Sequence, residues 1–236
     1  MPRWSPSSRM RAFIFARCAS NASRRFVVGS DMAEMESVAA QKARLRAQFR
    51  AIREDLGEAG RAAVSEAICR RAGALVREQG ARTVSAFWPL PGEVDLRPLL
   101  RQLRASGVTI ALPVTLSAPG EAPRLEHRAW TGPLVAGRFG VQEPPRDAPL
   151  VPSERVDLAF VPALAVAMDG TRLGYGGGFY DAYLARTDAL RLAVVASACV
   201  VPSLPAEPHD ARLGGFLTEH ETVRTDRQRN RDDAQT

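Results

Sequence analysis

Apolar side chains recur at helical spacing where the first regular pattern of the chain begins. Over residues 34–56 they fall three, four or seven positions apart and form one narrow stripe, made of Val38, Leu45, Phe49, Ile52 and Leu56. At about 100° per residue, this spacing predicts an amphipathic helix. A similar pattern predicts a second helix over 61–79, with Gly80 placed to cap it.

After residue 80 the pattern changes to short apolar runs separated by helical and turn segments. The predicted strands are TVSAFWPL (83–90), VTIALPV (108–114), LEHRAW (125–130), DLAFVPALAV (157–166), RLAVVASACV (191–200) and GFLTE (215–219). The predicted helices between them are LRPLLRQLRAS (96–106), which Gly107 ends, and FYDAYLART (179–187). This βαβ alternation predicts a single three-layer α/β domain, with the Pro-rich stretch 143–156 as a surface connection.

Composition and charge narrow the function classes. The chain has 236 residues, of which 45% are hydrophobic, and no apolar run reaches the roughly 20 residues of a membrane span. The net charge of +6 is concentrated at the start, because residues 1–31 contain six Arg and one Asp. The remaining residues are nearly neutral, which disfavours a nucleic-acid surface. We therefore expect a soluble globular protein without nucleic-acid or membrane partners.

The two ends of the chain differ from its body. Residues 1–31 are rich in Arg and Ser, as organellar transit peptides are. Met32 and Met35 stand directly before the first helical pattern, which favours an over-extended gene start or a flexible extension. We expect a domain over 32–223, a solvated polar tail over 224–236 and a cytoplasmic location.

The three cysteines are Cys18, Cys69 and Cys199. Their wide spacing and the absence of a CxxC pair fit neither a disulfide framework nor a zinc site. We expect reduced thiols, with Cys69 and Cys199 in the core.

The segment RLGYGGGFYDAY (172–183) has the strongest chemical signal. Glycines at 174, 176, 177 and 178 remove every Cβ from one face of a loop, so backbone N–H groups can approach an anion. A buried strand closed by an Asp169-Gly170 turn precedes the loop, and the predicted helix that follows begins at the same place. The pattern predicts a phosphate site. It is neither a GxxxxGK[ST] loop nor a dinucleotide fingerprint, and no GxSxG is present.

Several charged residues have two interpretations on spacing alone. Asp181 falls in the first turn of the predicted helix, where it either complements the helix dipole or holds magnesium, with equal weight. Lys42 and Arg46 are four apart and can reach a phosphate together, although a solvated helix face is favoured for such a pair. Glu93 follows a strand in a Pro-Gly turn, where an exposed loop acid is favoured over a ligand contact.

Four segments together resemble the 5-formyltetrahydrofolate cyclo-ligase family, also called methenyltetrahydrofolate synthetases. They are KARLR (42–46), the Glu93 turn, RFGVQEP (138–144) and VPALAVAMDGTRLGYGGGFYDAYL (161–184). The resemblance implies a three-layer α/β/α fold with a mostly parallel sheet, similar to the sugar-phosphate isomerase and CoA-transferase type. It also implies ATP- and Mg²⁺-dependent conversion of 5-formyltetrahydrofolate to 5,10-methenyltetrahydrofolate, with release of ADP and phosphate, by a monomeric enzyme of one-carbon metabolism.

The resemblance also assigns residues to roles. It implies that ATP is bound by Lys42, Arg46, Arg172, Leu173, Gly174, Tyr175, Gly176, Gly177, Gly178, Phe179 and Tyr180. Arg172 and Tyr180 would be catalytic, Asp181 would bind magnesium, and Trp88, Glu93 and Phe139 would bind the folate.

Two positions depart from the family pattern. Tyr175 stands where the family often has a basic residue, and Gly214 stands where it commonly has an Asp that contributes to the metal site. Asp210 is the nearby carboxylate that could substitute. A sequestering protein that binds folate or nucleotide without turnover therefore remains an alternative. A sugar-phosphate or CoA-ester enzyme is a third, without an obvious catalytic carboxylate beyond Glu93.

Overall fold

A seven-stranded sheet forms the centre of the fold. The computed structural model describes residues 36–116 and 124–225, and all of its helices and strands lie in one compact unit, Ser37–Thr236. The sheet strands are β1 (Thr83–Ser85), β2 (Thr109–Leu116), β3 (Arg124–Ala129), β6 (Leu158–Pro162), β9 (Leu190–Val194), β11 (Gly215–Leu217) and β12 (Thr222–Arg224). Their order is β12-β11-β9-β6-β1-β2-β3. Only the edge strands β3 and β12 are antiparallel to their neighbours, so the predicted mostly parallel sheet is confirmed.

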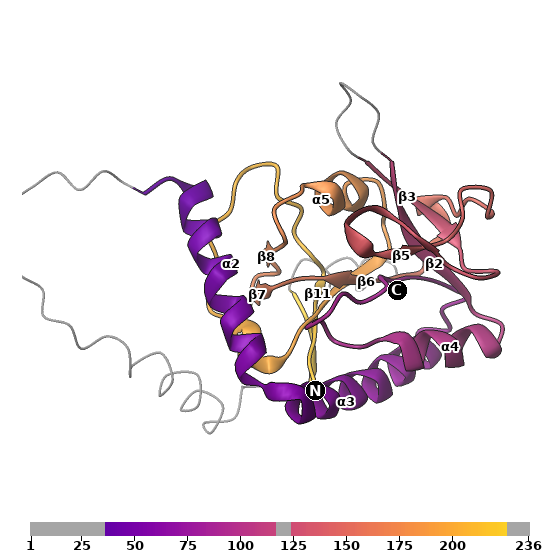
Figure 1. Cartoon of the computed structure of the whole chain (residues 1–236), viewed down its shortest axis with the longest axis horizontal. Coiled ribbons are helices and arrows are strands. Elements are labelled where there is room, and N and C mark those ends of the chain that lie inside the picture. Colours follow the sequence, from indigo (N-terminus) through magenta and orange to yellow (C-terminus); the bar gives the residue numbers. More distant parts are fainter. Residues whose placement is uncertain (1–35, 117–123, 226–236) are drawn as a thin grey trace, which may run out of the picture. The chain divides into compact units, whose positions relative to one another are not determined.

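Within the described residues, four α-helices accompany the sheet: α2 (Val38–Asp55), α3 (Gly57–Glu78), α4 (Arg97–Ala105) and α5 (Phe179–Leu184). The Ser37 hydroxyl accepts a hydrogen bond of 3.2 Å from the Ala40 amide and caps α2. Only Leu56 separates α2 from α3, and Figure 1 shows the two helices meeting there at an angle. The second helix thus begins four residues before the predicted range. Gly80 follows it with φ +60°, as its predicted capping role requires.

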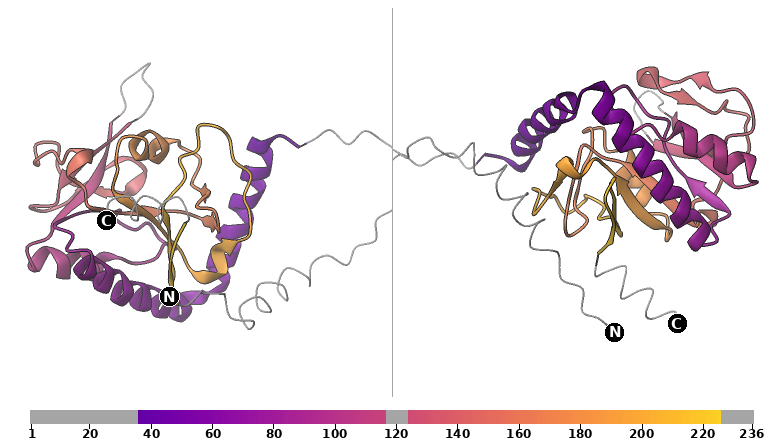
Figure 2. Two further views of the ribbon diagram at one scale, coloured as in Figure 1. Left: turned by 180° about the vertical axis from the view of Figure 1, so that it is seen from behind. Right: turned by 90° about the horizontal axis from the view of Figure 1, so that it is seen from below.

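Alternating side chains of β6 enter two different cores. Leu158 and Phe160 belong to a cluster with α3 and α4, whereas Ala159 and Val161 belong to a cluster with α2 and α5. Successive strand residues point to opposite faces, so both faces of the sheet are covered. Figure 2 shows α3 and α4 side by side on their face. The predicted three-layer α/β/α architecture is confirmed.

The strand predicted over 157–166 is divided in two, and the prediction of one strand was wrong. β6 ends at Pro162, and β7 (Ala165–Ala167) joins a second sheet of order β10-β7-β8, with β8 (Arg172–Leu173) and β10 (Val200–Val201). The Leu164 amide donates to the Leu173 carbonyl at 2.8 Å, which directs the chain away from the central sheet. After this change of direction, the glycine segment lies between the end of β8 and the start of α5.

The remaining elements are short. A hairpin of β4 (Val135–Ala136) and β5 (Gln142–Glu143) surrounds the 3-10 helix η1 (Arg138–Gly140). Two further 3-10 helices are η2 (Ser153–Arg155) and η3 (Ser197–Cys199). None of the helices within the described ranges has the length and apolar character that crossing a membrane requires.

Several predicted boundaries differ from the observed ones. The strand expected over 83–90 ends at Ser85, and the helix expected over 179–187 ends at Leu184. β12 was not predicted, and it extends one residue into the expected polar tail. Cys199 is buried and Cys69 half-buried, both as free thiols, whereas Cys18 and residues 1–31 lie outside the described residues.

Candidate active site

The glycine segment forms an exposed loop between β8 and α5. A Cβ at Gly174 would lie 2.7 Å from Nη1 of Arg172, and a Cβ at Gly176 would lie 3.2 Å from Cζ of Arg46. Gly176 and Gly178 also have φ values of +100° and +68°, which other residues rarely adopt. Glycine therefore lets two guanidinium groups approach the loop backbone.

Arg46 joins α2 to this loop. Its Nε donates to the Gly174 carbonyl at 3.0 Å, although the two residues are 128 positions apart in the chain. The predicted association of Arg46 with the glycine loop is thus present in the fold. The Leu173 side chain, by contrast, is 1% exposed in the core, so only its backbone faces the loop.

Arg172 and Asp181 form an ion pair beside the loop. Nη2 of Arg172 donates to Oδ1 of Asp181 at 3.0 Å, and the same oxygen accepts the Ala211 amide at 3.3 Å. The guanidinium carbon lies 5.6 Å from the ring centroid of Tyr180. Burial, with the nearby Glu93 charge, raises the pKa of the Tyr180 hydroxyl, so this group stays protonated at neutral pH.

Lys42 is held by the segment 207–210 instead of the glycine loop. Its Nζ donates to Glu207 at 2.7 Å and to Asp210 at 2.6 Å, and the residue is 5% exposed. Burial alone would lower the pKa of Lys42, but the hydrogen bonds and charges of Asp210 and Glu207 outweigh it and raise that pKa. Lys42 is therefore a charged, positioned ammonium group.

A chain of three polar side chains connects the glycine loop to Glu93. Arg53 Nη1 donates to the Tyr175 hydroxyl at 2.7 Å, and this hydroxyl donates in turn to Oε1 of Glu93. Oε2 of Glu93 accepts the Leu90 amide at 2.8 Å. Burial raises the pKa of Glu93, although the hydrogen bonds from Tyr175 and Leu90 oppose this shift. Tyr175 stands where the family often has a basic residue. Its uncharged hydroxyl therefore donates to the Glu93 carboxylate in place of a cation.

Arg53 is the main site residue that the sequence interpretation missed. It is 9% exposed, and its Nη2 also donates to the Ala163 carbonyl. Sequence spacing could have indicated this role. Arg53 follows Arg46 by seven positions and Lys42 by eleven, so all three side chains lie on one face of α2.

The predicted folate residues lie at two places. The Trp88 ring contacts the Trp130 ring edge to face, with centroids 5.3 Å apart, and both border a cavity of about 550 Å³. Glu93 follows Trp88 by five residues, in the same loop. Phe139 lies in η1, but its side chain is outside what the structure describes. Phe179 and Tyr180 are half-buried at the start of α5.

The carboxylates near the loop have the donor chemistry that magnesium prefers. Asp181 offers a carboxylate beside the glycine loop, and Asp210 precedes the residue whose amide binds Asp181. Glu207, His209 and Asp210 bring their ligand atoms within 4.8 Å of one another, and the Lys42 ammonium offsets one of the two carboxylate charges of this cluster. Gly214 supplies no side chain. Since magnesium often uses one or two carboxylates together with substrate phosphates, Asp181 with Asp210 fits such an ion.

Comparison with known proteins gives one family for the chain. Residues 38–219 match the model of the 5-formyltetrahydrofolate cyclo-ligase family. A 5-formyltetrahydrofolate cyclo-ligase of Mycolicibacterium smegmatis is 37% identical over 184 residues, which are 75% of this chain and 93% of the relative. One from Escherichia coli K12 is 34% identical over 143 residues, 58% of this chain and 78% of the relative.

Solved structures give the same result. The 5,10-methenyltetrahydrofolate synthetase of Aquifex aeolicus superposes with a TM-score of 0.68 at 29% identity, over 78% of this chain and 93% of that one. The synthetase of Mycoplasma pneumoniae shares the fold, with a TM-score of 0.61 at 18% identity, over 75% and 98% of the two chains. The predicted fold class and the predicted class of ligase are confirmed at the level of family. With a loop of four glycines, two arginines against it and a family match over most of its length, the chain belongs to the 5-formyltetrahydrofolate cyclo-ligase family.

Proposed function

We propose that this protein converts 5-formyltetrahydrofolate to 5,10-methenyltetrahydrofolate and consumes ATP, with release of ADP and phosphate. A formamide carbon is a poor electrophile, and its oxygen does not depart as hydroxide at a useful rate. Transfer of the γ-phosphoryl group to the formyl oxygen converts that oxygen into a leaving group. The nitrogen at position 10 then attacks the carbon and closes the ring as phosphate departs.

The glycine loop and its arginines bind the phosphates in this proposal. Phosphoryl transfer depends mainly on positioning and on positive charge around the migrating group. The amides of Gly174 to Gly178 surround the phosphates, and Arg46 and Arg172 neutralise them. Arg172 acts as a catalytic residue at the transferring phosphate, with Tyr180 held protonated beside it as a donor. Phe179 borders the nucleotide.

Lys42 joins these cations when the nucleotide binds. Its ammonium group is charged and fixed by Glu207 and Asp210, at 2.7 and 2.6 Å. A phosphate oxygen can take one of its three donor positions while a carboxylate keeps another. Removing Lys42 would leave two neighbouring carboxylates without their cation.

Asp181 and Asp210 hold Mg²⁺ in the proposed complex. A magnesium ion bound there supplies charge neutralisation to the ATP phosphates. Asp181 also orients Arg172 through their 3.0 Å hydrogen bond. This carboxylate therefore holds the catalytic guanidinium in position.

Glu93 binds the pterin end of the folate. Its carboxyl group accepts hydrogen bonds, and the Arg53–Tyr175 pair fixes its orientation. Trp88 and Phe139 provide apolar walls for the rings. The two ligands meet where Tyr175 joins the glycine loop to Glu93, and this connection is the observation that carries the proposal.

The test mixes the full chain with 5-formyltetrahydrofolate, ATP and Mg²⁺ and follows the near-ultraviolet band of the methenyl product together with ADP. We expect the two products in equal amounts, and no product when either ATP or Mg²⁺ is omitted. Arg46→Gln should raise the KM for ATP, whereas Arg50→Gln, one turn away and exposed, serves as the matched control. Product formed without ADP would contradict the proposal.

The second candidate is a sequestering protein that binds reduced folate or nucleotide without turnover. The observation that favours it is Gly214, which provides no carboxylate to the metal site. Titration separates the two, because this protein would bind 5-formyltetrahydrofolate without consuming ATP. A monomeric state and a cytoplasmic location remain predictions.

A further inference from the structure

The Lys42 ammonium group has two carboxylate partners. Its Nζ lies 2.7 Å from Oε2 of Glu207 and 2.6 Å from Oδ2 of Asp210. Two negative charges therefore face one positive charge. The cluster keeps an excess anion at a place where, in the proposed function, the phosphates of ATP bind.

Asp210 is held by the backbone of its own turn. Its Oδ2 also accepts the Glu207 amide at 2.6 Å, and its amide donates to the Glu207 carbonyl at 3.0 Å. The next residue is fixed as well, because the Ala211 amide donates to Asp181 at 3.3 Å. The Asp210 side chain is only 16% exposed. Moving this carboxylate away from Lys42 would break the turn, so Asp210 is the permanent partner.

The Glu207 side chain has no comparable support. Among the residues that the structure describes, only Lys42 donates a hydrogen bond to its carboxylate. The side chain is 36% exposed, and it is long enough to turn into solvent while the backbone stays in place. The exposed imidazole of His209 lies 3.9 Å from the same oxygen and offers a second position for it. Glu207 is therefore the partner that Lys42 can exchange.

A carboxylate and a phosphate group present the same chemistry to an ammonium group. Both accept charge-assisted hydrogen bonds from it at similar lengths. Lys42 is 5% exposed, and a buried cation without a partner is strongly unfavourable. Glu207 keeps Lys42 paired while nucleotide is absent, and a phosphate group that reaches Lys42 has to displace it.

We propose that Glu207 is an autoinhibitory contact of the nucleotide site, which occupies Lys42 in the free protein and is displaced by a phosphate group when ATP binds. The inference rests on the proposed function, because it takes Lys42 to be a phosphate contact. Binding of ATP then includes the loss of one ion pair, and the return of Glu207 assists release of ADP. Glu207 thus lowers the affinity for nucleotide, whereas a residue that only positioned Lys42 would raise it.

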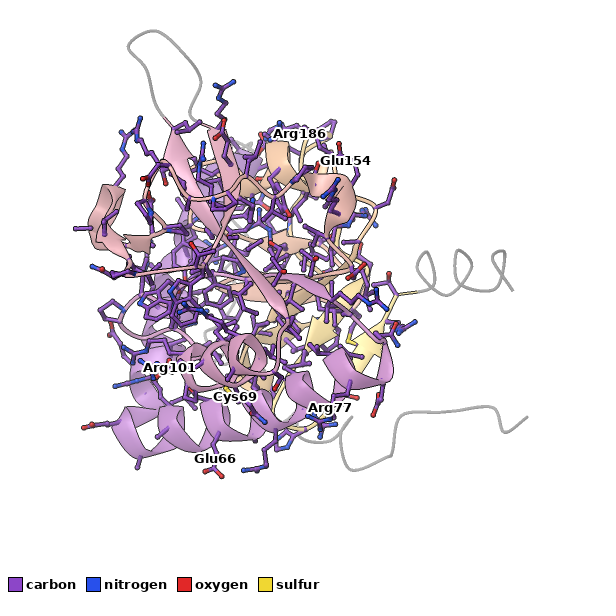
Figure 3. The ribbon with its side chains drawn as sticks, turned by 90° about the vertical axis from the view of Figure 1, so that its right-hand side faces the viewer. Glu66, Cys69, Arg77, Arg101, Glu154 and Arg186 are labelled. Atoms are coloured by element: carbon purple, nitrogen blue, oxygen red, sulfur yellow. The ribbon has the colours of Figure 1, made fainter. Side chains whose placement is uncertain are left out.

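The test measures ATP binding to the full chain by isothermal titration calorimetry with Mg²⁺ and without folate, so that no methenyl product forms. Glu207→Gln keeps an oxygen acceptor for Lys42 and removes the competing charge. We expect the Kd for ATP to fall about threefold to fivefold, the factor that corresponds to one partly exposed ion pair. Glu66→Gln makes the same charge change on α3, where Figure 3 shows Glu66 pointing away from the fold, and it should leave the Kd unchanged.

A double-mutant cycle separates competition at Lys42 from general repulsion of ATP. In a Lys42→Gln background, Arg46 and Arg172 still bind the phosphates, and adding Glu207→Gln should change the Kd by less than about twofold. The full gain in this background would overturn the inference, because Glu207 would then act without Lys42.

An unchanged or higher Kd in Glu207→Gln alone would also overturn the inference. If the wild-type chain forms methenyl product and ADP but Glu207→Gln does not bind ATP more tightly, the inference fails while the proposed function holds. If Glu207→Gln binds ATP more tightly but neither form makes methenyl product, the proposed function fails and the competing role of Glu207 stands. If neither form binds ATP, both fail.

Discussion

The two faces of the central sheet are built from different side chains. The face covered by α3 and α4 is filled by large aliphatic and aromatic residues, among them Ile68, Leu100 and Phe160. The face covered by α2 and α5 contains many alanines, such as Ala159, Ala163 and Ala193. The second face also contains buried polar side chains, including Lys42, Arg53 and His127.

This difference in side chains suggests that the two faces of the sheet contribute differently, one mainly to stability and the other mainly to catalysis. Large side chains at native packing density fix α3 and α4 against the sheet. Alanines instead leave room for β7 and β8, whose backbone brings the glycine loop to α2. We infer that substitutions on the α3–α4 face change mainly the free energy of unfolding, whereas substitutions on the α2–α5 face change mainly catalysis.

The largest expected effect is on turnover, at the α2–α5 face. Asp181→Asn should lower kcat about 100- to 1000-fold, because it removes the charge that orients Arg172 and the proposed magnesium ligand. The free energy of unfolding should change by only about 1 kcal/mol, since Asn keeps hydrogen-bonding capacity toward the Ala211 amide. Steady-state kinetics across a magnesium titration and urea unfolding measure both quantities. Asp147→Asn, an exposed turn residue, is the control, and a wild-type kcat in Asp181→Asn would remove the metal-ligand assignment.

On the α3–α4 face we expect the reverse outcome. Ile68 is 0% exposed, and Ile68→Ala should lower the free energy of unfolding by about 3 kcal/mol through lost burial and a cavity. The value of kcat at 25 °C should stay within about twofold, because the residues around the glycine loop pack with the cluster on the other face of the sheet. Ile68→Val should give a smaller loss of about 1 kcal/mol. A fall in kcat parallel to the loss of stability would show that the two faces are coupled.

A third effect is a pH dependence that comes from His127. This residue is 2% exposed, and its ring stacks on Tyr183 at a centroid distance of 3.8 Å. Burial, with a smaller contribution from the Arg186 charge, lowers the pKa of His127 to about 3. The unfolded chain binds a proton below about pH 6.5, whereas the folded chain does not until near pH 3. The stabilising contribution of the uncharged His127 ring is therefore fully present above about pH 6.5 and is lost as the pH falls toward 3.

The loss should amount to about 2 kcal/mol between pH 6.5 and pH 5. His127→Phe keeps the stacked ring and removes the titrating group, so it should flatten the curve of unfolding free energy over this range. Urea unfolding at a series of pH values measures the curve, with His220→Gln, an exposed imidazole, as control. A wild-type slope in His127→Phe would mean that other groups cause the acid sensitivity.

The smallest expected effect concerns substrate affinity. Tyr175→Phe removes the hydroxyl that joins Arg53 to Glu93, and it should raise the KM for 5-formyltetrahydrofolate about tenfold while the KM for ATP stays near its original value. Combined with Glu93→Gln, the effects should be less than additive, because both variants break the same chain of hydrogen bonds. Additive effects, or an equal rise in the KM for ATP, would contradict the assigned role of Tyr175.

The sequence by itself determined the features that depend on neighbouring residues. Helical spacing located α2, α3 and α4, and the glycine pattern located the loop with Arg172 and Asp181, which are nine positions apart. These predictions succeeded because periodicity and turn chemistry act over a few residues. The position of Glu93 in its Pro-Gly turn was likewise visible in the sequence.

Only the tertiary structure decided which distant groups meet. Lys42 pairs with Glu207 and Asp210, which are 165 and 168 positions away. Arg53 reaches Tyr175 across 122 positions. The division of the strand predicted over 157–166 also depends on hydrogen bonds to β8 and β10, which form only once the chain has folded back. A local pattern sets the conformation of a segment, but packing between segments selects its hydrogen-bond partners, and those partners define the site.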